Sequence, residues 1–126
     1  MANNQSGDNN SLSSTQDGGN NYLLNSQFGN NAKATVSQSG NFNQAYNYQD
    51  SSAAVLVASS SGYNNYIYNN QSGSATATIT QNGNFNSSSG SQSGVSNVVS
   101  VTQNGSNNAA VYAQNGTGNT ATINQH

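Results

Sequence analysis

The sequence predicts an all-β fold, a two-sheet parallel β-solenoid that stacks into a cross-β fibre. Three observations lead to this prediction. Glutamines recur every eleven residues, a glycine usually follows each of them two positions later, and the residues between these motifs alternate between apolar and polar types. Such a fixed period is the signature of repeat architectures, in which each repeat buries its faces against its neighbours.

The glutamine register extends over the whole chain. Of the twelve glutamines only Gln44 lies off it, Ser60 fills the one vacant place, and the step from Gln71 to Gln81 is ten residues long. We expect these side chains to point inward and form a self-assembly ladder, because stacked amides donate to one neighbour and accept from the other. The register glutamines are Gln5, Gln16, Gln27, Gln38, Gln49, Gln71, Gln81, Gln92, Gln103, Gln114 and Gln125.

A tight arc is predicted after each glutamine. Glycine tolerates the positive φ values that a sharp reversal needs, and asparagine, common at the fifth position, tolerates them as well. Ser51 replaces the glycine once, and Ala32 and Ala54 replace the asparagine. The arc glycines are Gly7, Gly18, Gly29, Gly40, Gly62, Gly73, Gly83, Gly94, Gly105 and Gly116. The asparagines assigned to the self-assembly ladders are Asn21, Asn43, Asn65, Asn86 and Asn108.

The five residues between successive arcs are predicted to be short strands. They alternate with period two and are enriched in β-branched residues, and no helical period fits them. At the inward positions of one segment, Ser88 and Gly90 place little bulk, so we expect residues 86–91 to be the most mobile part. A third amide ladder is expected at Asn25, Asn47 and Asn69.

Two consecutive blocks are expected to make one turn of about 22 residues, in the order strand, arc, strand, arc. Alternate blocks resemble each other more than adjacent ones do, which indicates that they stack on the same side of the solenoid. We expect residues 1–4 to be an N-terminal tail and residues 5–126 to be one solenoid domain. The predicted turns are 5–26, 27–48, 49–70, 71–91 and 92–113, followed by a half turn at 114–126.

An aromatic stack is predicted on the outer face. Tyrosines fall at neighbouring outward positions of successive turns, where their rings come close enough to pack against one another. The chain has seven tyrosines, so this cluster holds most of them. Its members are Tyr22, Tyr46, Tyr48, Tyr66 and Tyr68.

The composition disfavours several functional classes. Only 3% of residues are charged, and the single basic side chain, Lys33, cannot neutralise a run of phosphates, so we expect no nucleic-acid partner. No apolar run is long enough for membrane insertion. Asp8, Asp17 and Asp50 lie at different arc positions without a histidine or second acid to support them. We therefore expect no enzymatic activity, metal or cofactor.

Three segments carry a family resemblance: QSGNFNQAYNYQ (38–49), QNGSNNAAVYAQ (103–114) and QNGTGNTATINQ (114–125). They resemble the curlin repeat of curli subunits, secreted bacterial proteins that polymerise into functional amyloid. The resemblance implies an extracellular, cell-surface fibre subunit of the biofilm matrix that serves adhesion. It also implies export through the curli secretion pore with its chaperone, and nucleation by a minor subunit. In its scarcity of Lys and Arg, the chain resembles the major subunit more than the minor one.

The residues themselves also favour self-assembly into a homopolymer. No capping segment is visible before Gln5 or after Gln125, so we expect both ends to expose unpaired backbone and unfinished ladders. The chain opens without the basic and apolar regions of an export signal, so an extracellular location implies that such a signal is missing from this sequence.

The alternative is an ice-binding β-solenoid that uses outward threonine rows. Threonines at outward positions could order water on a flat face. Valines and one lysine interrupt this array, and β-branched outward residues suit strands in any case. The threonines are Thr76, Thr78, Thr80, Thr120 and Thr122, and the interrupting residues are Lys33, Val55, Val57 and Val98.

Overall fold

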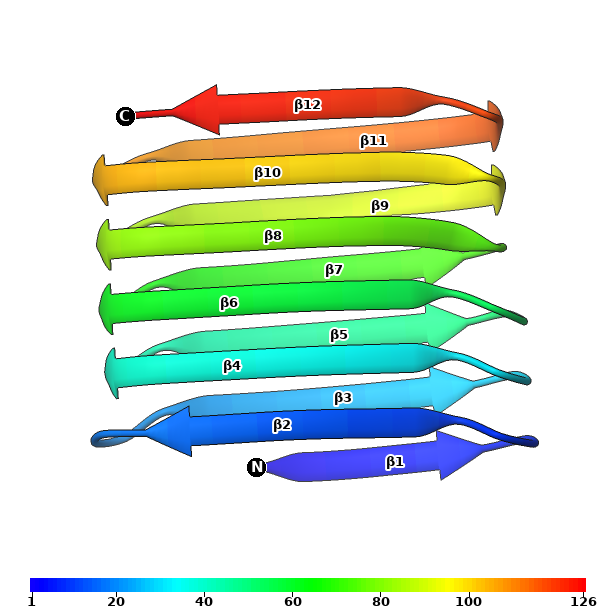
Figure 1. Ribbon diagram of the computed structural model, residues 1–126, viewed down its shortest axis with the longest axis horizontal. Helices are drawn as coiled ribbons and strands as arrows, with labels where there is room; N and C mark the ends of the chain where they lie inside the picture. Colours follow the sequence, from blue (N-terminus) through cyan, green and yellow to red (C-terminus); the bar gives the residue numbers. More distant parts are fainter.

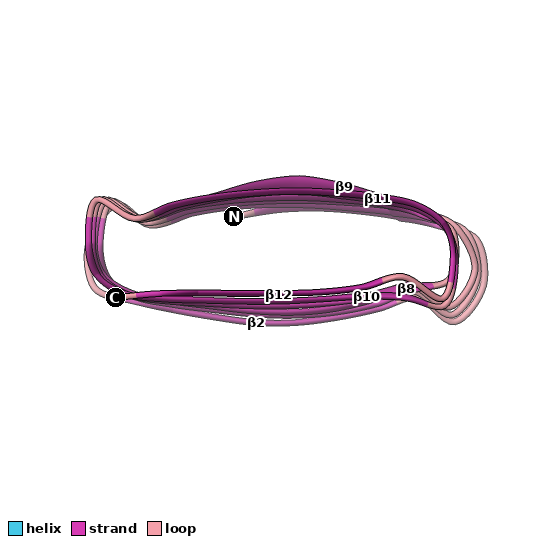
Figure 2. Ribbon diagram, turned by 90° about the horizontal axis from the view of Figure 1, so that it is seen from above, coloured by secondary structure: helices cyan, strands magenta, loops and turns pink.

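The computed structural model describes residues 1–126 and confirms the predicted fold class. Twelve strands coil into a solenoid with two parallel six-stranded sheets (Figures 1 and 2). The odd sheet holds β1 (Ala2–Ser6), β3 (Tyr22–Phe28), β5 (Gln44–Asp50), β7 (Tyr66–Ser72), β9 (Ser87–Val95) and β11 (Ala109–Thr117). The even sheet holds β2 (Ser11–Asp17), β4 (Lys33–Asn41), β6 (Val55–Tyr63), β8 (Ala75–Asn84), β10 (Asn97–Ser106) and β12 (Thr120–Gln125).

The register between neighbouring strands follows the sequence period. In most strand pairs each residue lies opposite the residue 22 positions further along the chain, as Gln27 lies opposite Gln49. The shortened step changes this offset to 21, as in the pairing of Gln71 with Gln92. Because the missing residue falls in the arc between β7 and β8, both sheets keep their glutamine positions aligned, with Ser60 as the one substitution. Viewed along the solenoid, successive turns lie almost on top of one another (Figure 2).

Two details differ from the sequence prediction. Ala2–Asn4, expected in a tail, belong to β1, and Ala2 pairs with Leu24 of β3. This pairing gives each sheet six strands, whereas the sequence predicted five and a half turns. Apart from β1, the strands are also longer than the predicted five residues, reaching ten in β8 and β10, where they continue past the glutamine into the arc.

The arcs stack backbone on backbone. All ten predicted arc glycines have positive φ. At Gly83 (φ +118°) an added Cβ would overlap the carbonyl of Gly105 in the next turn, so this position leaves no room for a side chain. Two positions further on, non-glycine residues also adopt positive φ, including Phe42 (φ +59°) and Phe85 (φ +57°). Most arcs therefore contain two left-handed residues, of which the sequence indicated only the first.

The core is narrow and only partly apolar. The even sheet contributes two apolar columns, whose central members include Leu56 and Ile79. The odd sheet contributes one apolar column, in which Leu23 and Ile67 are buried, and fills the remaining interior with amides. Seventeen of the 33 buried residues are polar. The structure contains no helix that is long and apolar enough to span a membrane.

Candidate assembly interface

The glutamines of the odd sheet form an unbroken ladder. In each turn the Nε2 of one glutamine donates to the Oε1 of the glutamine in the next turn. The second Nε2 hydrogen of Gln49 reaches across to the carbonyl of Lys33 at 3.1 Å, which ties the odd sheet to the first residue of β4. The donor–acceptor distances along Gln5, Gln27, Gln49, Gln71, Gln92 and Gln114 are 2.6, 3.0, 2.9, 3.2 and 2.9 Å.

The ladder of the even sheet is interrupted at Ser60. Gln16 donates to Gln38 at 2.6 Å, and the series resumes with Gln81 donating to Gln103 at 2.8 Å. Ser60 is too short to continue it, and its Oγ bonds instead to Asn43 Oδ1 at 3.3 Å. The Oε1 of Gln81 is consequently buried without a donor. Gln103 then donates to Gln125 at 2.8 Å.

The arc asparagines form a second kind of ladder at the edge of the solenoid. Asn43 is representative: its Nδ2 donates to the carbonyl of Ser39 in its own arc and to that of Gly62 in the next, both at 3.0 Å. Its Oδ1 accepts the backbone N–H of Asn65 at 3.1 Å. Each asparagine thus satisfies backbone groups that the tight arc leaves without strand partners. Asn21, Asn65, Asn86 and Asn108 occupy equivalent places.

A third ladder, inside the odd sheet, ends in a feature that sequence reasoning missed. Asn47 donates to Asn25 at 2.6 Å and Asn69 donates to Asn47 at 3.0 Å. Two turns further on, the Tyr112 hydroxyl donates to Asn69 Oδ1 at 2.8 Å. Its ring occupies the space that a side chain at Gly90 would need, and burial raises the pKa of its phenol.

Residues 86–91 were expected to be mobile because Ser88 and Gly90 leave space in the interior, and the structure shows what occupies this space. Gly90 and Ser88 do lie on the inward side, but the Tyr112 ring occupies the volume beside Gly90. Ser88 remains poorly accommodated, since its buried Oγ has no hydrogen-bond partner. A bulky residue one turn after a glycine, in the same register column, was the sequence signal that could have revealed this compensation.

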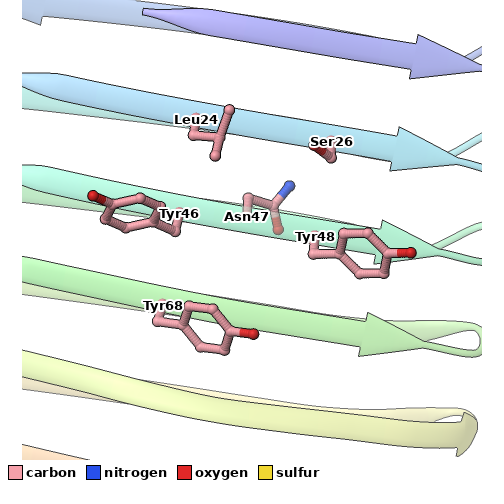
Figure 3. A pocket seen from close by; sticks show the side chains of 6 residues that line it. All are labelled: Leu24, Ser26, Tyr46, Asn47, Tyr48 and Tyr68. Carbon is pink, nitrogen blue, oxygen red and sulfur yellow. The ribbon is translucent and has the colours of Figure 1, made fainter.

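The predicted outward tyrosines lie together on β3, β5 and β7. Tyr46 packs against Tyr22 and Tyr66, with ring centroids 5.5 and 5.6 Å apart. Tyr48 packs instead against Phe28 at 5.7 Å, and with Tyr68 it borders a shallow groove on the odd sheet (Figure 3). Partial burial, then the neighbouring Tyr46 and Tyr68, raise the pKa of Tyr66.

A second aromatic stack, on the arcs, was not predicted. Tyr63 packs edge-on against Phe42 and Phe85 at 5.4 and 5.6 Å. The three residues come from successive arcs on one edge of the solenoid, but they do not share one register position in the sequence. Their stacking was therefore not visible as a periodic pattern.

The charged residues do not gather at any site. Asp8, Asp17, Lys33 and Asp50 are all exposed; the first two lie on the first turn, and the other two lie on the second and third turns. No group of three or more His, Cys, Asp or Glu side chains is placed so that it could hold a metal ion.

Both ends of the solenoid present free strand edges, and the two glutamine ladders end there with opposite hydrogen-bonding groups. At the end formed by β1 and β2, the Oε1 atoms of Gln5 and Gln16 have no ladder donor, whereas those of Gln27 and Gln38 in the next turn accept one. At the end formed by β11 and β12, Gln114 and Gln125 each use one Nε2 hydrogen on a backbone carbonyl and leave the other free. The glutamine ladders therefore offer acceptors at one end and donors at the other.

The fold and its ladders define a class: a two-sheet β-solenoid built from amide repeats, with free strand edges at both ends. The family model described as curlin associated repeat matches residues 74–103 and 94–126. The C-terminal part of the chain, residues 74–126, is therefore similar to the curlin repeat, and its repeats and the fold fit a structural subunit of the curli type. No curated protein matches the chain.

Proposed function

We propose that the chain is a self-assembling structural subunit of an extracellular, curli-like amyloid fibre. The observation that carries the proposal is the polarity of the two ends. The Nε2 donors of Gln114 and Gln125 complement the Oε1 acceptors of Gln5 and Gln16, so two copies match only when they stack head to tail. Repetition of this contact extends a filament without limit.

The register of the contact follows from extending the observed pairing by one turn. β1 of the incoming copy takes the place after β11, and β2 takes the place after β12 (Figure 1). Gln5 then falls on Gln114, and Gln16 falls on Gln125. Both glutamine ladders continue through the junction, as do the parallel hydrogen bonds of both sheets.

Apolar surface at the ends supports the same contact. Leu12 on one end and Ala121 and Ile123 on the other pack against the core but are only partly buried within a single copy. Stacking places Leu12 on Ala121, in the column where every interior member is buried. Burial of this apolar surface favours association by about 25 cal/mol per Å².

The family supports the biological setting of the proposal. Curli fibres are extracellular, and we propose the same location for this chain, with roles in the biofilm matrix and in adhesion. Export through a secretion pore with its chaperone and nucleation by a minor subunit belong to the proposal too. The chain itself, with one basic residue, is proposed as the major subunit.

Seeded assembly tests the proposal. We expect the purified chain at about 50 µM to form cross-β filaments after a lag, and fragments of these filaments to abolish the lag. Gln125→Ala removes a ladder amide at the end of the solenoid and should slow elongation. Asn124→Ala removes an exposed amide from the same strand and should not. A chain that stays monomeric, or equal rates for the two variants, would contradict the proposal.

The ice-binding alternative has one observation in its favour. An outward column of the even sheet consists of hydroxyl residues over five turns: Thr15, Ser37, Ser59, Thr80 and Thr102. The neighbouring columns contain Lys33, Val55, Val57 and Val98, which interrupt the array. Thermal hysteresis produced by a monomer that does not form filaments would favour this alternative over the fibre.

A further inference from the structure

The outward face of the odd sheet is divided into two parts of different bulk. On β3, β5 and β7 large side chains dominate, and on β9 and β11 small ones do. The large residues are Tyr22, Leu24, Phe28, Tyr46, Tyr48, Tyr66 and Tyr68. The small residues are Ser87, Ser89, Ser91, Ser93, Ala109 and Ala113, and the same outward columns of β11 also hold Val111 and Asn115.

In a head-to-tail filament this division becomes a regular alternation. β1 of the next copy follows β11 and presents Ala2, Asn4 and Ser6 on the same face. Three bulky rungs are then followed by three rungs of smaller residues, and the pattern repeats with every subunit. A surface with alternating ridges and shallows of equal length is complementary to itself when shifted by half its period.

We propose that two filaments of this chain pair through their odd sheets, shifted by three rungs so that the bulky rungs of one enter the shallows of the other. The partner filament is turned by half a turn about the filament axis. At about 4.8 Å per rung, the shift is about 14 Å. This inference rests on the proposed function, since the alternation is continuous only in a filament.

The shift relieves collisions that an unshifted pair would suffer. With the axis between the columns of Tyr46 and Tyr48, unshifted filaments bring these two rings against each other from opposite sheets. A shift of three rungs instead brings Tyr46 opposite Ala113 and Tyr48 opposite Val111. Tyr68 falls opposite Asn4 of β1 by the same geometry. Side chains of unequal size then interdigitate, as they do in the dry interfaces between paired sheets of amyloid.

The electrostatics of this face are compatible with pairing. Asp50 is the only charged residue on it, and the shifted arrangement brings it opposite Ala109 rather than another carboxylate. It lies in the outermost column, where water can still reach it. The even sheet carries Lys33 and shows no comparable alternation of large and small residues, so it offers no preferred shift.

The mass per unit length of filaments, measured by scanning transmission electron microscopy, tests the pairing. We expect the unmodified chain to form filaments with twice the single-filament value. Ala113→Trp fills a shallow and should give single filaments with unchanged seeded elongation. Thr78→Trp adds the same bulk to the exposed face of the even sheet and should leave the filaments paired.

A charge exchange tests the shift itself. Val111→Lys and Tyr48→Glu should each separate the filaments, and the double variant should restore pairing, because these positions meet only between filaments shifted by three rungs. Single filaments from the unmodified chain, or a double variant that stays unpaired, would overturn the pairing while leaving the proposed function intact. Failure of the unmodified chain to form any filament would overturn both.

Discussion

The two glutamine ladders differ by one residue, and the difference shows what the interior requires. In the odd sheet all six glutamines are joined, whereas in the even sheet Ser60 interrupts the series and Gln81 Oε1 is left unpaired. The interruption lies in the middle turns. At both ends each ladder has its glutamine, so the amides that would meet between copies are complete. A single internal gap is tolerated because neighbouring rungs retain their bonds to backbone carbonyls, as Gln81 does to Tyr66.

A serine placed in the uninterrupted glutamine ladder of the odd sheet, as Ser60 stands in the even sheet, should have the largest effect on filament stability. Gln49→Ser removes the bonds to Gln27, Gln71 and Lys33 and leaves Gln71 Oε1 buried without its ladder donor. We expect the filaments to lose about 3 kcal/mol of stability per subunit, since buried unpaired groups cost about 1–3 kcal/mol each. Dissolution in guanidinium measures the loss. Asn82→Ser, which removes an exposed amide, is the control and should change stability by less than about 0.5 kcal/mol.

The second largest loss of stability is expected at Tyr112, where the inner asparagine ladder ends. Tyr112→Phe keeps the ring over Gly90 but removes the hydroxyl that donates to Asn69 Oδ1. Because this acceptor is buried, we expect a loss of about 2 kcal/mol at neutral pH. Equal stability of the variant and the parent in guanidinium would show that the ladder does not depend on this terminal bond.

The difference in stability between the parent chain and Tyr112→Phe should depend on pH. Burial raises the pKa of Tyr112 in the folded state above its unfolded value, so the stabilisation from its neutral phenol is complete below about pH 10 and is lost as pH rises further. The advantage of the parent over Tyr112→Phe should therefore shrink in alkaline solution. Unfolding midpoints between pH 7 and pH 11 measure it, and a constant difference would contradict the assignment.

Repairing the interrupted ladder should have a smaller effect of opposite sign. Ser60→Gln supplies a donor for Gln81 Oε1 and an acceptor for Gln38 Nε2. The gain should be about 1 kcal/mol, because the new side chain loses rotamer freedom and the bond from Ser60 to Asn43 is given up. Ser60→Ala is the matched control and should not stabilise. A repaired ladder that is less stable than the parent would show that the gap cannot hold an amide.

The smallest effect on stability is expected at Ser88, whose hydroxyl is buried in an otherwise apolar column of the odd sheet. Ser88→Ala removes an unpaired polar atom and should stabilise by less than about 1 kcal/mol. Ser89→Ala, on the outward side of the same strand, should leave stability unchanged. A loss of stability in Ser88→Ala would indicate that the hydroxyl has a partner.

The sequence was sufficient to predict the solenoid because its main requirement, amides at matching heights, is periodic in the chain. The parts it did not reveal depend on contacts that are not periodic. β1 escaped prediction because Ala2–Asn4 have no apolar alternation, and their strand forms only by pairing with β3. Tyr112 was counted as an inward residue, but its contact with Asn69 spans two turns. The positive φ of Phe42 runs against the usual preference of a bulky residue.

Cysteine cross-linking in mixed filaments tests whether both sheets continue head to tail from one copy to the next. Extension of the register places Thr122 of one copy beside Ser13 of the next, both exposed on the even sheet. Filaments grown from a mixture of Ser13→Cys and Thr122→Cys should, on mild oxidation, yield disulfide-linked dimers that contain one chain of each kind. Dimers formed by either variant alone, or equally by Thr122→Cys with Thr15→Cys, would contradict head-to-tail stacking in this register.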